Sequence, residues 1–260
     1  MIEEPYRWVD AIANRREYID SELAAGSPTI GISYDDGILL LTFGRDRRKI
    51  FEIYDRIALG GIGHPGDLER LRMMAIELAS TEGFTRSAAD VSLRRMANYS
   101  FSPALKQAFE QLYGAPFLAR LLFAELDTTP DNDLFLRLDY DGSIHASSMP
   151  NRKARENFGA IAGTKRSLEN VEALLRSAHV TDLHSAIETA IRGWGMGLYM
   201  ADEEHREVAD EDQLTTLLKQ RMDGYSVEAA ILSRKAVRPS IAYRPVPESD
   251  LENVLSKYRL

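Results

Sequence analysis

The chain has 260 residues and carries 40 acidic against 32 basic side chains, so its formal net charge is −8. A chain of this length can bury a large core without covalent support, and because it has no cysteine, disulfides and thiolate metal sites are excluded. The acidic balance argues against a general nucleic-acid-binding protein. No apolar run approaches the roughly 20 residues of a membrane span, and the N-terminus is too polar for a signal peptide, so we expect a soluble cytoplasmic protein.

The first predicted element is a long helix over residues 6–24. Its apolar residues recur at helical spacing on one narrow stripe, and its other face is charged. A helix with so thin a stripe needs a surface to lie on, either its own sheet or a neighbouring subunit. The stripe consists of Val9, Ile12, Ile19 and Leu23, with Trp8 beside them.

Four short strands follow, arranged as two hairpins. The first hairpin pairs residues 29–34 with 38–43 across an Asp-Asp-Gly turn, in which Gly37 can take the positive φ that the turn needs. Because residues 38–43 are almost all apolar, we expect that strand to be buried on both faces. The second hairpin pairs residues 49–53 with 56–62.

Two helices are predicted after the hairpins. The first covers residues 65–82, begins at a proline and ends before Gly83. The second covers residues 87–113, starts at a capping box built on Ser87, and is broken or kinked by Pro103. Both are expected to lie on one face of the sheet.

A second group of strands comes next. Turns rich in Asp, Pro and Gly separate the first three of these strands, and a basic loop over residues 148–156 precedes the fourth. The strands are predicted over residues 117–126, 133–139, 143–147 and 157–162.

Two further helices are predicted over residues 165–178 and 181–194. Three alternating glycines, Gly193, Gly195 and Gly197, are expected to end the second of them. The elements that close the chain are two strands and a helix, over residues 227–233, 240–244 and 248–257.

Residues 198–224 form an acidic segment with a helical pattern over residues 210–221, and we interpret the segment as an insertion. Strands therefore occur in blocks, and so do helices, which predicts antiparallel sheets layered between helices, an α+β fold. No linker is long or flexible enough to divide the chain, so residues 1–260 are expected to form one domain.

The sequence from Gly61 to Gly66 fits the pattern GxGxxG between a strand and a helix. A dinucleotide site would also need a βαβ unit and an acidic residue at the end of its second strand. Here the preceding strands are hairpins and the following region is helical, so a tight strand-to-helix turn is the favoured interpretation. The five histidines show no helical i, i+4 pair, and we expect neither a metal nor a cofactor.

Ser27 is the one candidate nucleophile. Cleavage after Gly26 would free an amine beside its hydroxyl, and Lys49 could tune that amine, as in N-terminal nucleophile hydrolases. The alternative is that Ser27 is simply the first residue of a strand.

Several short motifs occur in a characteristic order between Tyr6 and Ile231. They are Gly26-Ser27-Pro28-Thr29-Ile30-Gly31, the Asp36-Gly37 turn, Lys49 in a Lys-Ile-x-x-Ile-Tyr-Asp pattern, the small-residue strand and helix from Ala58 to Leu71, Asp141-Gly142-Ser143-Ile144, and the corner Ile161-Ala162-Gly163-Thr164-Lys165. With the helix that precedes them, these motifs resemble the proteasome core-particle family, and its α-type subunits of the bacterial type in particular.

The resemblance implies a four-layer αββα sandwich of the N-terminal nucleophile hydrolase type. Catalytic β subunits of the family use an N-terminal threonine, a supporting aspartate and a helper serine. The matching positions here are Ser27, Phe43 and Lys165. We therefore expect no catalytic residue and a non-catalytic α-type subunit that keeps the helix of residues 1–25. The alternative is a self-processed, β-like hydrolase that uses Ser27.

The resemblance also implies partners. Such α subunits form a ring that caps β subunits, gates substrate entry for protein degradation, and receives the C-terminal tail of an ATPase or other activator. The tail carboxylate is bound by a lysine, here Lys49, with Gly63 and His64 lining the pocket. Neither nucleic acid nor membrane is an expected partner. The basic loop 148–156 and the acidic segment 198–224 are longer than the family norm.

Overall fold

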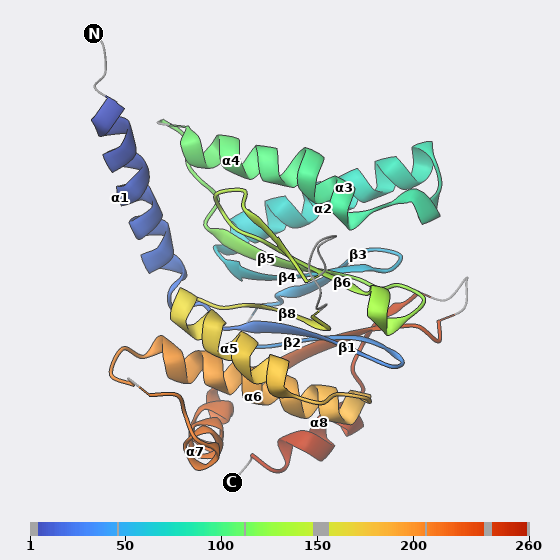
Figure 1. Cartoon of the computed structure of the whole chain (residues 1–260). Helices are drawn as coiled ribbons and strands as arrows, with labels where there is room; N and C mark the ends of the chain where they lie inside the picture. The colour runs from blue at the N-terminus through green and yellow to red at the C-terminus, as the bar shows by residue number, and fades with distance from the viewer. Residues whose placement is uncertain are drawn as a thin grey trace.

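In the computed structural model, residues 5–45, 47–111, 113–147, 156–205, 207–236 and 241–258 are described. Two five-stranded antiparallel sheets face each other, with helices on both outer sides (Figure 1). The first sheet has the order β10 (Tyr243–Pro245), β9 (Ser226–Ser233), β2 (Gly37–Gly44), β1 (Thr29–Tyr34), β8 (Phe158–Ile161). The second has the order β3 (Ile50–Tyr54), β4 (Ile57–Gly63), β5 (Ala119–Glu125), β6 (Leu134–Leu138), β7 (Ile144–Ala146).

Helices complete the outer layers. One outer layer, on the second sheet, contains α2 (Pro65–Thr85), α3 (Leu93–Met96) and α4 (Ser102–Glu110). The other, on the first sheet, contains α5 (Lys165–Ser177), α6 (Leu183–Ala201), α7 (Glu211–Arg221) and α8 (Glu248–Leu255). The expected four-layer αββα sandwich is confirmed.

Three apolar layers hold the sandwich together, one beneath each set of helices and one between the sheets. The run of apolar residues in β2 is explained by its position, because the strand packs against apolar layers on both faces. Leu39 and Leu41 pack toward α6, whereas Ile38 and Leu40 pack between the sheets. Since side chains of a strand alternate between its two faces, a strand in the interior of this sandwich must be apolar on both.

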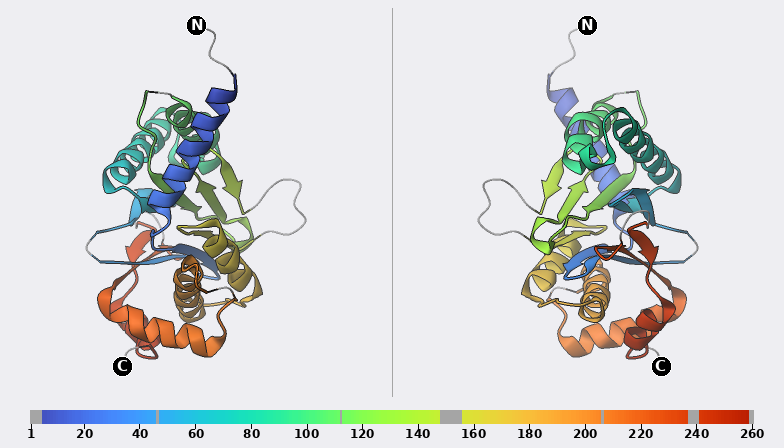
Figure 2. Two further views of the ribbon diagram at one scale, coloured as in Figure 1. Left: turned by 90° about the vertical axis from the view of Figure 1, so that its left-hand side faces the viewer. Right: turned by 90° about the vertical axis from the view of Figure 1, so that its right-hand side faces the viewer.

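The helix α1 (Pro5–Leu23) leaves the sandwich beside the junction of the two sheets and projects beyond it, as Figure 2 shows from the side. Its C-terminal half is anchored, with Ile19 and Leu23 fully buried in the layer between the sheets. Its N-terminal half exposes Trp8 and Val9, and Tyr18 is also exposed. The thin apolar stripe is therefore only partly used within the chain.

The predicted helix over residues 87–113 differs from the structure. A 3-10 turn covers Ala88–Asp90, α3 begins at Leu93, and a π turn over Ala97–Phe101 joins α3 to α4. Ser87 does not cap a backbone N–H; its hydroxyl contacts the Asp90 carboxylate. Pro103 lies in the first turn of α4, where its missing N–H is tolerated, and the π turn precedes it.

The glycines of α6 do not end that helix, which continues to Ala201. A Cβ on Gly195 would lie 2.8 Å from Leu218 Cδ2, and one on Gly197 would lie 2.5 Å from Pro28 Cγ. These glycines therefore allow close packing rather than termination. Similarly, α2 runs through Gly83 to Thr85.

The acidic segment 198–224 begins inside α6 and contains α7, whose Leu214 and Leu218 are buried in the core. Most of the basic loop, residues 148–155, and the predicted strand start at Ser240 lie outside the described residues.

Candidate functional site

The three predicted docking residues, Lys49, Gly63 and His64, lie at one end of the second sheet. The strands β3 and β4 are antiparallel with Ile50 opposite Gly60, so β3 starts where β4 ends. The Lys49 carbonyl accepts a hydrogen bond from the N–H of Gly61 at 3.1 Å. Gly63 is the last residue of β4, and His64 follows it. The structure thus brings the three positions to the same end of one hairpin.

Lys49 is half-buried, and burial lowers the pKa of its ammonium group. The nearby Glu228 carboxylate opposes that shift. Glu228 also binds the backbone at this point, because its two oxygens accept hydrogen bonds from the N–H of Lys49 at 2.7 Å and of Ile50 at 3.1 Å. Burial raises the pKa of Glu228, while these N–H groups act in the opposite direction.

Gly63 makes the turn that places His64. It has φ +137°, and a Cβ there would lie 2.0 Å from the carbonyl oxygen of Leu118, so a side chain is not accommodated. The N–H of His64 donates to that same carbonyl at 2.7 Å. The exposed His64 ring caps α2 by accepting the Gly66 N–H at 3.2 Å. The GxGxxG sequence is therefore the tight strand-to-helix turn that was expected.

Ser27, the alternative nucleophile, is buried. Its hydroxyl donates to the carbonyl oxygen of Phe43 at 2.7 Å and accepts from the Trp194 indole N–H at 2.8 Å. Phe43 and Trp194 also contact each other through their rings. At the position matched to the helper serine, Lys165 is exposed and makes an i, i+4 ion pair with Glu169. Neither a carboxylate nor a second hydroxyl is thus supplied to Ser27 at the two matched positions.

A cluster of ion pairs holds α1 against the sandwich, and no sequence pattern predicted it. The Arg120 guanidinium donates to the carboxylate of Asp20 in α1 at 2.6 Å and to Asp139 at 3.2 Å. The Tyr140 hydroxyl donates to the same Asp20 oxygen at 2.8 Å, and burial together with this contact raises the pKa of Tyr140. Nearer the start of α1, Arg15 donates to the Phe109 carbonyl at 2.7 Å. The anchored half of α1 is therefore held by polar contacts as well as by apolar packing.

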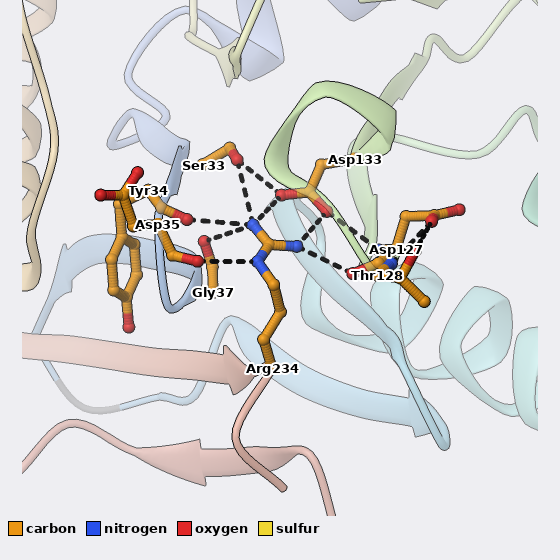
Figure 3. Close-up of polar contacts among 8 residues, drawn as sticks. All are labelled: Ser33, Tyr34, Asp35, Gly37, Asp127, Thr128, Asp133 and Arg234. Carbon is orange, nitrogen blue, oxygen red and sulfur yellow. Dashed lines mark hydrogen bonds and ion pairs between the residues drawn. The ribbon is translucent and has the colours of Figure 1, made fainter.

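A buried ion pair joins the two sheets at the other end of β1 (Figure 3). The Arg234 guanidinium makes two hydrogen bonds of 2.7 Å to the Asp133 carboxylate, and the two side chains are 10% and 1% exposed. The guanidinium also donates to backbone carbonyls of Tyr34 at 3.0 Å and Asp127 at 2.8 Å. These contacts join the turn of the first hairpin to the segment that connects β5 and β6.

Within the described part of the chain, no group of three or more His, Asp or Glu side chains could hold a metal ion. No described helix is long and apolar enough to cross a membrane.

Comparison with known proteins gives a consistent result. Residues 23–149 match the family described as "Proteasome subunit". The chain is 34% identical over 172 residues to "Proteasome subunit alpha" of Acidothermus cellulolyticus, which covers 65% of this chain and 68% of that protein. It is 27% identical over 246 residues to the protein of the same name from Thermobifida fusca, covering 94% and 86% of the two chains. The Thermomonospora curvata protein is 26% identical over 246 residues, covering 94% and 93%.

Proposed function

This chain belongs to the proteasome subunit family, with α-type subunits as its relatives, and we propose that it acts as a non-catalytic ring subunit. In this role it forms a ring with like subunits, caps a ring of β subunits in the cytoplasm, and restricts the entry of proteins to be degraded. The observation that carries the proposal is the state of Ser27. Its side chain is buried, and its hydroxyl is occupied by hydrogen bonds with the Phe43 carbonyl and the Trp194 indole N–H.

Ring assembly has support in the shape of α1. The residues Trp8, Val9 and Tyr18 are exposed on a helix that projects beyond the body of the chain (Figure 2). Trp8 and Val9 are neighbours on the projecting half of the helix, and large apolar side chains that are exposed beside each other mark a protein contact more often than a solvated face. The occupant we propose is the neighbouring copy in the ring, because the anchored half of α1 fixes the direction in which the exposed half points.

Activator docking is proposed for the end of the hairpin formed by β3 and β4. A half-buried ammonium is a strong partner for a carboxylate, since a charge-assisted hydrogen bond gains strength where water is partly excluded. Lys49 offers that ammonium, and the turn at Gly63 and His64 forms the adjacent wall. The proposed ligand is the C-terminal carboxylate of an activator tail.

The competing function is a self-processed hydrolase that uses Ser27. Activation of this hydroxyl would require cleavage after Gly26, where the chain is tightly packed. A Cβ on Gly26 would lie 2.1 Å from Ile62 Cγ2. The intact mass of the purified chain separates the two functions, because a hydrolase would lose residues 1–26.

The decisive experiment is co-expression of this chain with a proteasome β subunit from the same source, followed by electron microscopy and a peptidase assay. We expect rings of this chain stacked on β rings, with peptidase activity that depends on the β subunit alone. Peptidase activity from the isolated chain would contradict the proposal.

A further inference from the structure

One acidic side chain stands out in β9, whose other central residues are apolar or small. Glu228 lies opposite Thr42 of β2 in the first sheet, yet its carboxylate reaches the start of β3 in the second sheet. There it accepts the N–H groups of Lys49 and Ile50 at 2.7 and 3.1 Å. One carboxylate therefore fixes the backbone of Lys49 relative to both sheets.

The backbone at this point needs an acceptor from outside its own sheet. The strand β3 is at the edge of the second sheet, and its partner β4 already uses the Lys49 carbonyl through the Gly61 N–H. The N–H groups of Lys49 and Ile50 are satisfied by Glu228 instead. An unsatisfied backbone donor that is shielded from water is costly. A carboxylate can accept both donors at once, whereas an amide side chain has only one acceptor oxygen.

The hydrogen bonds of Glu228 to the backbone also limit its contact with the Lys49 ammonium. Both of its oxygens are occupied by N–H donors, and Arg48 lies 3.8 Å from one of them. Across the described residues, the Lys49 ammonium makes no ion pair with a carboxylate. The ammonium is thus close enough to Glu228 to be influenced by its charge but is not neutralised by direct contact.

We infer that Glu228 is the positioning residue of Lys49: it holds the lysine at the end of the hairpin of β3 and β4 as a cation that no described carboxylate pairs, ready for the carboxylate of a peptide C-terminus. This inference rests on the docking function proposed above for Lys49. It adds a residue 179 positions away in the sequence, whose task is to place and charge the lysine rather than to touch the ligand.

The proposed role of Glu228 predicts how peptide binding depends on pH. Burial lowers the pKa of the Lys49 ammonium and the Glu228 charge raises it again. Binding of a carboxylate needs the protonated lysine, so affinity falls as the pH rises through the pKa of Lys49. Without the Glu228 charge this fall moves to lower pH. Arg48, His64, Glu52 and Tyr243 are the other charged or titratable groups described beside this hairpin end, and Arg48 and Glu52 both affect the pKa of Tyr243, so these three share the same surroundings.

The test uses the full chain and a synthetic peptide with a free C-terminal carboxylate, and the same peptide as its C-terminal amide. The peptide ends in hydrophobic-Tyr-any residue, the tail pattern that the family resemblance implies for activators. Affinities are measured by fluorescence anisotropy from about pH 7.5 to about pH 10.5, a range chosen to span the lysine titration. The variants are Glu228→Gln, Glu228→Asp and Lys49→Met. Glu52→Gln is the matched control, because it removes the same charge from the same region without a bond to the Lys49 backbone.

We expect Glu228→Gln to weaken binding of the free-acid peptide about tenfold at the lowest pH and to shift the loss of binding to lower pH. Glu228→Asp keeps the charge and should retain more of the wild-type pH profile. Glu52→Gln should leave both affinity and profile unchanged. A purely structural role would lower affinity equally at every pH, and that result would overturn the inference.

Failure of the inference and failure of the docking function are distinguishable. If the wild type prefers the free acid to the amide, Lys49→Met loses that preference, and Glu228→Gln behaves as the wild type, then the docking function stands and the role of Glu228 is wrong. If the wild type does not distinguish the acid from the amide, both are wrong. Should Glu228→Gln not fold, the affinity of Glu228→Asp at the lowest pH decides: its shorter side chain cannot reach both N–H groups, so it should bind the free-acid peptide more weakly than the wild type although the charge is kept, and an unchanged affinity would overturn the inference.

Discussion

The Arg234–Asp133 ion pair is the contact whose removal has the most calculable effect. The variant Arg234→Met keeps an unbranched apolar stem and removes the guanidinium charge. It leaves the Asp133 carboxylate, which is 1% exposed, with the Ser33 hydroxyl and the Asp127 N–H as its partners. Breaking a buried ion pair by deleting one partner costs about 3–5 kcal/mol, because the remaining charge stays buried and uncompensated. We expect the free energy of unfolding to fall by about that amount.

The neighbouring lysine provides a matched control. Lys235 pairs with Asp36 in the same turn, but these side chains are 72% and 53% exposed. An exposed pair contributes about 0–1 kcal/mol, so Lys235→Met should be close to neutral. Chemical denaturation of both variants measures the difference. For a chain of this size, Arg234→Met should also lower the melting temperature by roughly 10 °C.

The result that would refute this reasoning is an equal, small effect of the two variants. A second measurement tests the cause. Asp133→Asn in the Arg234→Met background removes the stranded charge, so the double variant should be more stable than Arg234→Met alone. If Asp133→Asn makes the chain still less stable, the penalty does not come from an uncompensated carboxylate. Peptide docking should be unaffected in every case, since this cluster lies at the opposite end of β1 from Ser27.

Three further predictions concern assembly and function. Deleting residues 1–25 should abolish ring formation, because it removes the exposed face of α1; a truncated chain that still elutes as a ring in size-exclusion chromatography would refute this. Lys49→Ala should leave the ring intact but weaken binding of an activator tail by at least about tenfold in calorimetry, since a charge-assisted hydrogen bond is lost. Ser27→Ala should give an unprocessed chain with the mass of its full-length sequence and should leave the peptidase activity of the assembled complex unchanged, whereas loss of activity in this variant would revive the hydrolase alternative.

Much of the fold could be read from local patterns. The hairpin of β1 and β2, the burial of β2 on both faces, and the α5 helix follow from alternation and helical spacing within short windows. The motifs that carry the family resemblance are also local, and they were sufficient to place Lys49, Gly63 and His64 at one hairpin end. Position 63 in particular requires glycine, because the backbone there has a positive φ.

Predictions from sequence patterns were wrong where the structural role of a residue depends on the residues that pack against it. The glycines of α6 are compatible with a helix end by sequence, but Leu218 and Pro28 press against them and the helix continues. The π turn between α3 and α4 likewise precedes Pro103, whose nitrogen carries no hydrogen and cannot donate to a regular helical hydrogen bond.

What the sequence determined by itself is therefore most of the strands and helices, the faces that they bury, and the family. Only the tertiary structure decided which charges meet. Glu228 contacts the backbone of Lys49, Arg234 contacts Asp133, and Arg120 contacts Asp20, all between residues at least 100 positions apart. Periodicity records that a face is buried, but the partner of a buried polar group is set by how two sheets and a helix come together in space, and no short window of sequence contains that information.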